Sequence, residues 1–171
     1  MCHLVATLLL ATLASPQTPP PAPPAPAAAT MLARLAGAWT GTGVILGQAS
    51  KVEMQWTSVL DGRFVRLTFT SHIGPPPKTQ RFEGHAYYAV GDSGRVGATW
   101  FDSSGLTRPI EARVEAAALV SAWGTPDTEL GETTYRLVSD HEIEVVDRVR
   151  RKDGTWREFG RSTLSRTLPP R

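Results

Sequence analysis

The stretch KVEMQWTSVLDGRFVRLTFT, residues 51–70, carries the pattern that decides the fold. Apolar and polar residues alternate along both halves of this stretch, and the halves meet at Asp61-Gly62. A period of two places successive side chains on opposite faces of a strand, so that one face is buried and the other meets water. An Asp-Gly pair between two such runs suits a type I′ turn. The stretch therefore predicts an antiparallel β-hairpin.

Alternating runs and turn residues continue through the rest of the chain. The runs cover residues 39–46, 51–60, 63–72, 79–90, 95–102, 107–115, 118–124, 132–138, 141–151 and 155–167. Turn residues separate them, as in Gly91–Gly94 and Asp153-Gly154. Short strands about 10 residues apart with tight turns favour an antiparallel meander over a parallel sheet.

The predicted fold is therefore all-β, with a single closed or nearly closed antiparallel meander barrel of about ten strands. Closure is expected because a barrel removes the exposed edges that an open sheet of this size would have. A short helical turn over Met31–Leu35, with Thr30 as its N-cap, is expected before the first strand.

The first 30 residues contain no Lys, Arg, Asp or Glu and differ from the rest of the chain. An apolar run over residues 4–13, followed by Ala14 and Ser15, is typical of a signal peptide. The Pro/Ala tract that follows favours extended polyproline II structure and suits a tether. We therefore expect a signal peptide over 1–15, a Pro/Ala-rich linker over 16–30, and the barrel domain over 31–168 of a secreted or periplasmic protein. The alternative is that translation starts at Met31.

Composition narrows the classes of partner. The chain has 171 residues and a formal net charge of +2, with acidic and basic residues mixed along the predicted strands. Such mixing gives no single-sign surface, so nucleic acid is not expected as a partner. The one cysteine, Cys2, falls in the predicted signal peptide, so the fold must depend on its hydrophobic core. No apolar run reaches the roughly 18 residues that a transmembrane helix needs. These patterns leave the oligomeric state open.

Three motifs in a fixed order resemble a known superfamily. They are Gly37-Ala38-Trp39 at the first strand, Leu60-Asp61-Gly62-Arg63-Phe64 at the hairpin, and Trp100-Phe101-Asp102-Ser103 at a later turn. Together they resemble the calycins, which comprise lipocalins, fatty-acid-binding proteins and nitrobindin-like barrels. The nearest likeness is to bacterial secreted lipocalin-like domains of unassigned function, and it extends from Met31 to Leu168.

The calycin resemblance implies a structural pair at the barrel floor. In calycins an arginine of the last strand packs across the first-strand tryptophan, here Trp39, and closes the floor by cation–π attraction. Arg166 matches that place, and Arg161 is the alternative. Nitrobindin-like barrels hold haem through a histidine near the C-terminus, but this chain has no histidine after His141. We therefore expect no cofactor, and no spacing of His, Cys, Asp or Glu indicates a metal site.

The barrel interior is the natural place for a ligand. Aromatic residues expected on the inward faces of several strands are the candidates for its lining: Trp56, Tyr88, Trp100, Trp123 and Tyr135. The alternative is that these side chains fill the interior. No catalytic residue is predicted, because Asp102 before Ser103 and Ser104 is a common turn former and no nucleophile elbow occurs.

Three functions remain open at this point. The first is binding of a small apolar or amphipathic molecule in the barrel interior. The second is a non-catalytic barrel that acts through its outer surface on a protein or an envelope component. The third is an enzyme of unknown type, for which an inward polar group with a shifted pKa would be the sign.

Overall fold

The computed structural model describes residues 27–91 and 95–167. The predicted signal peptide, most of the predicted linker and Leu168 lie outside the described residues. In the described part of the chain, no helix is long and apolar enough to cross a membrane.

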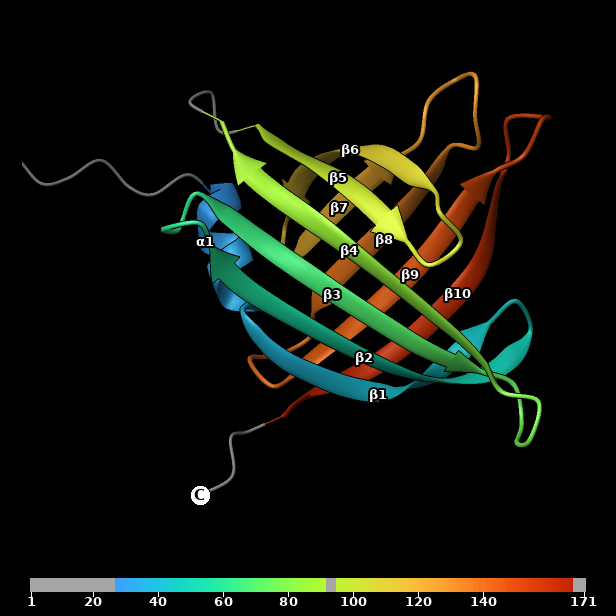
Figure 1. Ribbon diagram of the computed structural model, residues 1–171. Helices are drawn as coiled ribbons and strands as arrows, with labels where there is room; N and C mark the ends of the chain where they lie inside the picture. Colours follow the sequence, from blue (N-terminus) through green and yellow to red (C-terminus); the bar gives the residue numbers. More distant parts are fainter. Residues whose placement is uncertain (1–26, 92–94, 168–171) are drawn as a thin grey trace, which may run out of the picture.

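One helix and ten strands make up the structure (Figure 1). Their bounds are α1 (Ala27–Leu35), β1 (Gly37–Ile45), β2 (Gln48–Val59), β3 (Phe64–Ile73), β4 (Gln80–Val90), β5 (Val96–Asp102), β6 (Thr107–Glu115), β7 (Ala118–Trp123), β8 (Gly131–Leu137), β9 (Glu142–Arg150) and β10 (Trp156–Thr167). Each strand pairs antiparallel with its neighbours in sequence, and β1 pairs with β10 to close the barrel. The predicted all-β meander barrel is thereby confirmed.

The two ends of the barrel differ. Helix α1 lies at one end, beside the turns that join β2 to β3 and β6 to β7, as Figure 1 shows. The connections β1–β2, β3–β4, β5–β6, β7–β8 and β9–β10 gather at the opposite end, which we call the open end. A meander produces this arrangement because successive turns fall at alternate ends.

Helix α1 is longer than the predicted helical turn. It has 9 residues and begins at Ala27, so residues 27–30, which the sequence pattern assigned to the linker, belong to it. Thr30 lies within the helix, and the prediction that it caps the N-terminus is wrong. Alanine is the strongest helix former, and a spacing of three or four residues places four apolar side chains on one face. These are Ala28, Met31, Leu32 and Leu35, and all are buried.

The half of the barrel next to α1 is filled by side chains. Trp56 packs between two tyrosines, with ring centroids 5.3 Å from Tyr88 and 5.1 Å from Tyr135. Fully buried aliphatic residues surround this cluster, among them Leu67, Leu119, Ile143 and Leu164. Any internal space therefore lies toward the open end.

Arg166 lies over Trp39, with its guanidinium carbon 4.1 Å from the ring centroid. The two residues are register partners on β1 and β10. Arg166 also donates through Nη2 to the carbonyl of Arg34 at 2.7 Å, and through Nη1 to the carbonyl of Ala36. It thereby supplies donors to carbonyl groups at the end of α1 that have no helical partner. Arg161 instead lies on the outer face, where it pairs with glutamates.

Candidate ligand-binding cavity

A cavity of about 540 Å³ occupies the half of the barrel toward the open end. It is lined by residues near the open ends of the strands, such as Ile45, Ile73 and Leu106, and by residues deeper inside, such as Tyr88 and Val145. The volume falls in the range of small-molecule sites in proteins. The interior is therefore divided into a packed half and a hollow half.

Two groups of aromatic rings line the cavity. Trp100 on β5 lies 6.3 Å from Phe69 and 6.4 Å from Phe82, measured between ring centroids. Trp123 on β7 lies 6.5 Å from Phe159 on β10 in an edge-to-face arrangement. Phe159 falls in a β-bulge between Glu158 and Gly160. Such a bulge re-aims a side chain, and it brings Phe159 to the cavity.

Glycines explain why these large rings leave the interior open. A Cβ at Gly84 would overlap the six-membered ring of Trp100, and a Cβ at Gly131 would overlap that of Trp123. Each indole therefore covers the backbone of a glycine on the neighbouring strand. An alanine at either position would push its indole away from the barrel wall and into the cavity.

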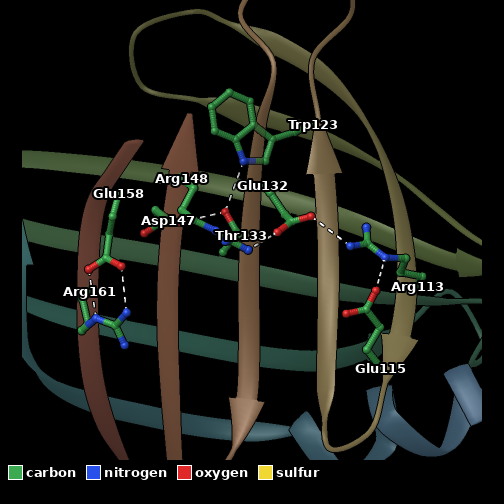
Figure 2. A network of polar contacts seen from close by, with 9 residues as sticks. All are labelled: Arg113, Glu115, Trp123, Glu132, Thr133, Asp147, Arg148, Glu158 and Arg161. Atoms are coloured by element: carbon green, nitrogen blue, oxygen red, sulfur yellow. Dashed lines mark hydrogen bonds and ion pairs between the residues drawn. The ribbon is translucent and has the colours of Figure 1, made fainter. Parts of the chain in front are cut away.

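A row of polar side chains crosses the inner wall on three adjacent strands. Ser121 on β7 pairs in register with Thr133 on β8, which pairs in turn with Asp147 on β9. Thr133 Oγ1 donates to Asp147 Oδ1 at 2.7 Å and accepts from Trp123 Nε1 at 3.2 Å, as Figure 2 shows. Ser121 Oγ lies 3.1 Å from the hydroxyl of Tyr88. We call Ser121, Thr133 and Asp147 the polar row.

Asp147 is a half-buried carboxylate that lines the cavity. Burial raises its pKa to about 6, and the charge of Glu158 acts in the same direction against the hydrogen bond from Thr133. No described Lys, Arg or His forms an ion pair with it. Its Oδ2 lies beside Gly160, where a Cβ would come within 2.8 Å of that oxygen.

Two buried tyrosines add neutral polar groups to the cavity. Burial raises the pKa of Tyr88 to about 12, and burial together with the nearby Tyr88 and Asp147 raises that of Tyr135 well above its ordinary value. Both phenols therefore stay protonated at physiological pH and remain able to donate a hydrogen bond.

Asp102 also lines the cavity, but its oxygens already accept hydrogen bonds from the β5–β6 turn and from Trp100. Its Oδ1 accepts from the backbone N–H groups of Ser104 at 2.9 Å and Leu106 at 3.2 Å, and Oδ2 accepts from Trp100 Nε1 at 3.1 Å. Burial would raise the pKa of Asp102, but hydrogen bonds from Ser104, Trp100 and Leu106 outweigh it and hold the pKa below its ordinary value. Asp102 thus forms the turn and positions Trp100.

At the mouth, Arg108 and Glu129 lie beside exposed apolar side chains. The Arg108 guanidinium carbon lies 5.2 Å from the centroid of the Trp123 ring, and its Nη2 lies 3.6 Å from Glu129 Oε2. Leu46 and Leu106 line the same opening and are exposed on the surface. Arg81 also lines the cavity and pairs with Glu83, so the lining combines two paired arginines with apolar groups.

The outer wall beside the polar row carries ion pairs. Figure 2 shows Glu132 between Arg148, at 2.6 Å, and Arg113, at 3.0 Å, with Arg161 paired to Glu158 nearby. Opposite charges neutralise one another there. In residues 27–91 and 95–167, no group of three His, Cys, Asp or Glu side chains is placed to hold a metal ion.

The structure brings four of the five predicted lining residues together. Tyr88, Trp100, Trp123 and Tyr135 all line the cavity. Trp56 does not, because it lies packed against the two tyrosines, inside the filled half.

Sequence reasoning missed several lining residues, including Phe69, Arg108, Asp147 and Phe159. Asp147 had a signal in the sequence. On its strand Ile143, Val145 and Val149 share one parity, and Asp147 occupies the remaining position of that same apolar face. An acidic residue on a face otherwise expected to be buried is unusual and indicates a specific role.

Comparison with known proteins supports the fold. The structure is similar to the S-type phycobiliprotein lyase CPES from Guillardia theta, with a TM-score of 0.57 and 8 % identity, over 83 % of this chain and 93 % of that one. At this identity the likeness shows the fold alone.

Two further solved structures are similar at lower scores. EF1p2_mFAP2b bound to DFHBI has a TM-score of 0.48 and 12 % identity, over 82 % of this chain and 100 % of that one. A protein of unknown function from the DUF3598 family of Nostoc punctiforme PCC 73102 has a TM-score of 0.31 and 8 % identity, over 82 % and 99 %. No family model matches the sequence, and no curated protein matches it either.

Proposed function

We propose that this protein binds a small amphipathic molecule with an apolar or aromatic body inside its barrel. The observation that carries the proposal is the cavity of about 540 Å³, lined by aromatic rings and open at one end. Burial of an apolar ligand against such walls is favourable because it removes apolar surface from water.

The Trp/Gly pairs favour a binding cavity over an incompletely filled core. A side chain added at Gly84 would displace Trp100 into the open space, and one added at Gly131 would displace Trp123. A barrel that needed only stability would gain from larger residues, since empty space in a core costs contact energy. The arrangement instead keeps both indoles against the barrel wall, where they line an open space large enough for a small molecule.

We also propose that binding takes place after export from the cytoplasm. The support is the apolar run of residues 4–13 with small residues after it, which is typical of a signal peptide. A secreted or periplasmic barrel of this kind would hold an apolar molecule that is poorly soluble in water.

Tryptophan fluorescence and thermal unfolding test the binding of fatty acids, retinoids, quinones and haem. We expect at least one class to quench or shift the emission and to raise the melting temperature, because a ligand that binds only the folded state stabilises it. The stabilisation is about 2.7 kcal/mol when free ligand is a hundred times its dissociation constant.

Glycine variants show whether the ligand occupies the cavity. Gly131→Ala and Gly84→Ala are expected to weaken binding at least about tenfold, because each would move an indole into the ligand's space. Gly97→Ala is the matched control, since nothing lies within 4 Å of a Cβ at that exposed position of β5. Absence of any response in the wild type would leave binding through the outer surface as the better account.

A further inference from the structure

The charged side chains that line the cavity differ in how far hydrogen bonds and ion pairs already occupy them. Asp102 accepts hydrogen bonds on both oxygens from its own turn and from Trp100. Arg108 is paired with Glu129 at the mouth. Asp147 accepts one hydrogen bond, on Oδ1 from Thr133, and its Oδ2 accepts none from the described residues.

Asp147 lies where a ligand would reach it. It is half-buried, lines the cavity and stands at the end of the polar row, with Phe159 on the next strand also lining the cavity. Gly160, its register partner, has no side chain to cover Oδ2. A carboxylate in this position has lost part of its hydration without gaining a cation in exchange.

We infer that the ligand carries a protonated amine or a comparable N–H donor, which binds Asp147 Oδ2 while the ligand's apolar body lies between the aromatic groups. The inference rests on the function proposed above and assigns the chemical class of that ligand. It adds Asp147 as the residue that orients the ligand and selects its charge.

Charge complementarity favours a cation over the other head groups. A charge-assisted hydrogen bond to the carboxylate is stronger than a neutral one and replaces the hydration that burial removed. The face of Phe159, which also lines the cavity, attracts a cation as well. An anionic head group would meet Asp147 inside the cavity. The two arginines that line the cavity are already engaged, Arg108 with Glu129 and Arg81 with Glu83.

Three compounds with the same ring and different head groups test this inference by isothermal titration calorimetry. They are 1-naphthylmethylamine, which is cationic at about pH 8, neutral 1-naphthalenemethanol, and anionic 1-naphthoate. For the wild-type barrel we expect the amine to bind at least about tenfold more tightly than the alcohol, and the naphthoate most weakly.

Asp147→Asn keeps the size of the side chain and an oxygen that accepts from Thr133, but it removes the charge. In this variant we expect the amine and the alcohol to bind within about twofold of each other. Glu144→Gln is the matched control, since Glu144 lies on the outer face of the same strand and pairs with Arg161 and Arg136. The Glu144→Gln variant should keep the wild-type preference for the amine over the alcohol.

The outcomes separate this inference from the function on which it rests. If the alcohol binds as tightly as the amine, or if Asp147→Asn keeps the preference, the inference is wrong and the binding cavity stands. Tighter binding of the naphthoate would overturn it as well. If none of the three compounds binds and the screen of larger ligands is also negative, both proposals fail.

Discussion

The carboxyl group of Asp147 lies in a buried environment that disfavours its charged form. Its pKa is raised from an ordinary value of 3.8 to about 6 by burial. Between these two pH values the folded state binds more protons than the unfolded state. The contribution of this group to stability is therefore fully present below about pH 4 and is lost as the pH rises through 6.

The stability of the wild type and of Asp147→Asn, compared at pH 4 and pH 8, tests this pH dependence. Asp147→Asn should be more stable than the wild type by about 1–2 kcal/mol at pH 8. The full pKa shift corresponds to about 3 kcal/mol, and the expected difference is smaller because solvent screens a carboxylate that is only half-buried. At pH 4 the advantage should vanish, because Asp147 is then protonated. Urea unfolding measures the difference, and a difference that does not change with pH would contradict the cause assigned here.

Gly84 and Gly131 have a role at the residue scale that depends on their neighbours. Neither has a positive φ, so conformational freedom does not explain them. What requires glycine is the indole that lies on each backbone, Trp100 in one case and Trp123 in the other. Absence of a side chain at these two positions therefore preserves the volume of the cavity.

At the scale of elements, helix α1 and strand β10 together close one end of the barrel. Trp39 Nε1 donates to the carbonyl of Leu35 at 2.8 Å, and Arg166 donates to the carbonyls of Arg34 and Ala36. The pair thus joins the end of the helix to the first and last strands. The closed end is the floor beneath the packed half of the interior.

Substitutions at this floor are expected to have unequal effects. Trp39→Ala should lower the free energy of unfolding by about 3–5 kcal/mol, the range for a large buried aromatic residue. Arg166→Ala should cost less, because the ring keeps most of its burial, and Arg166→Lys should recover only part of that loss, since lysine lacks the planar fork. Denaturant unfolding measures all three, and negligible effects of both alanine changes would show that the floor does not depend on this pair.

Strand β10 shows how a bulge changes the face of the sheet on which a side chain lies. On β10, Gly160 and Ser162 point inward in step, and a regular strand would then turn Phe159 outward. The bulge between Glu158 and Gly160 breaks this alternation and brings Phe159 to the cavity. One irregular residue thereby supplies part of the aromatic lining.

At the scale of the whole molecule, α1 limits where the chain could begin after the export proposed above. Ala28 is buried in the helix that closes the barrel, so removal of residues up to Met31 would take away a turn of it. Cleavage after Ala14 or Ser15 would keep the helix complete.

Within the predicted window from Ser15 to Met31 we therefore expect the mature chain to start before Ala27, most simply after Ala14 or Ser15. N-terminal sequencing of protein from the secreted or periplasmic fraction measures the position. An intact Met1 on soluble cytoplasmic protein would show that the apolar run is not a signal peptide.

Strands and turns could be predicted because their causes are local or follow from order along the chain, whereas the Trp39–Arg166 pair was expected from the calycin resemblance. A period of two in residues 51–70 and an Asp-Gly turn act over a few residues, and an antiparallel meander follows once such hairpins repeat. Trp39 and Arg166 stand at the two termini of the barrel, where closure brings first and last strands together. The start of α1 was missed because alanines next to prolines suit a linker as well as a helix.

The sequence alone determined the all-β meander and five of the inward aromatic residues, although it missed the phenylalanines. Only the tertiary structure decided that half of the interior is hollow and that Asp147 faces it. The physical reason is that a cavity depends on which side chains meet across strands. Trp100 covers Gly84, Trp123 covers Gly131, and Asp147 stands between Thr133 and Gly160. Each of these contacts depends on the register of paired strands, which alternation within a single strand does not specify.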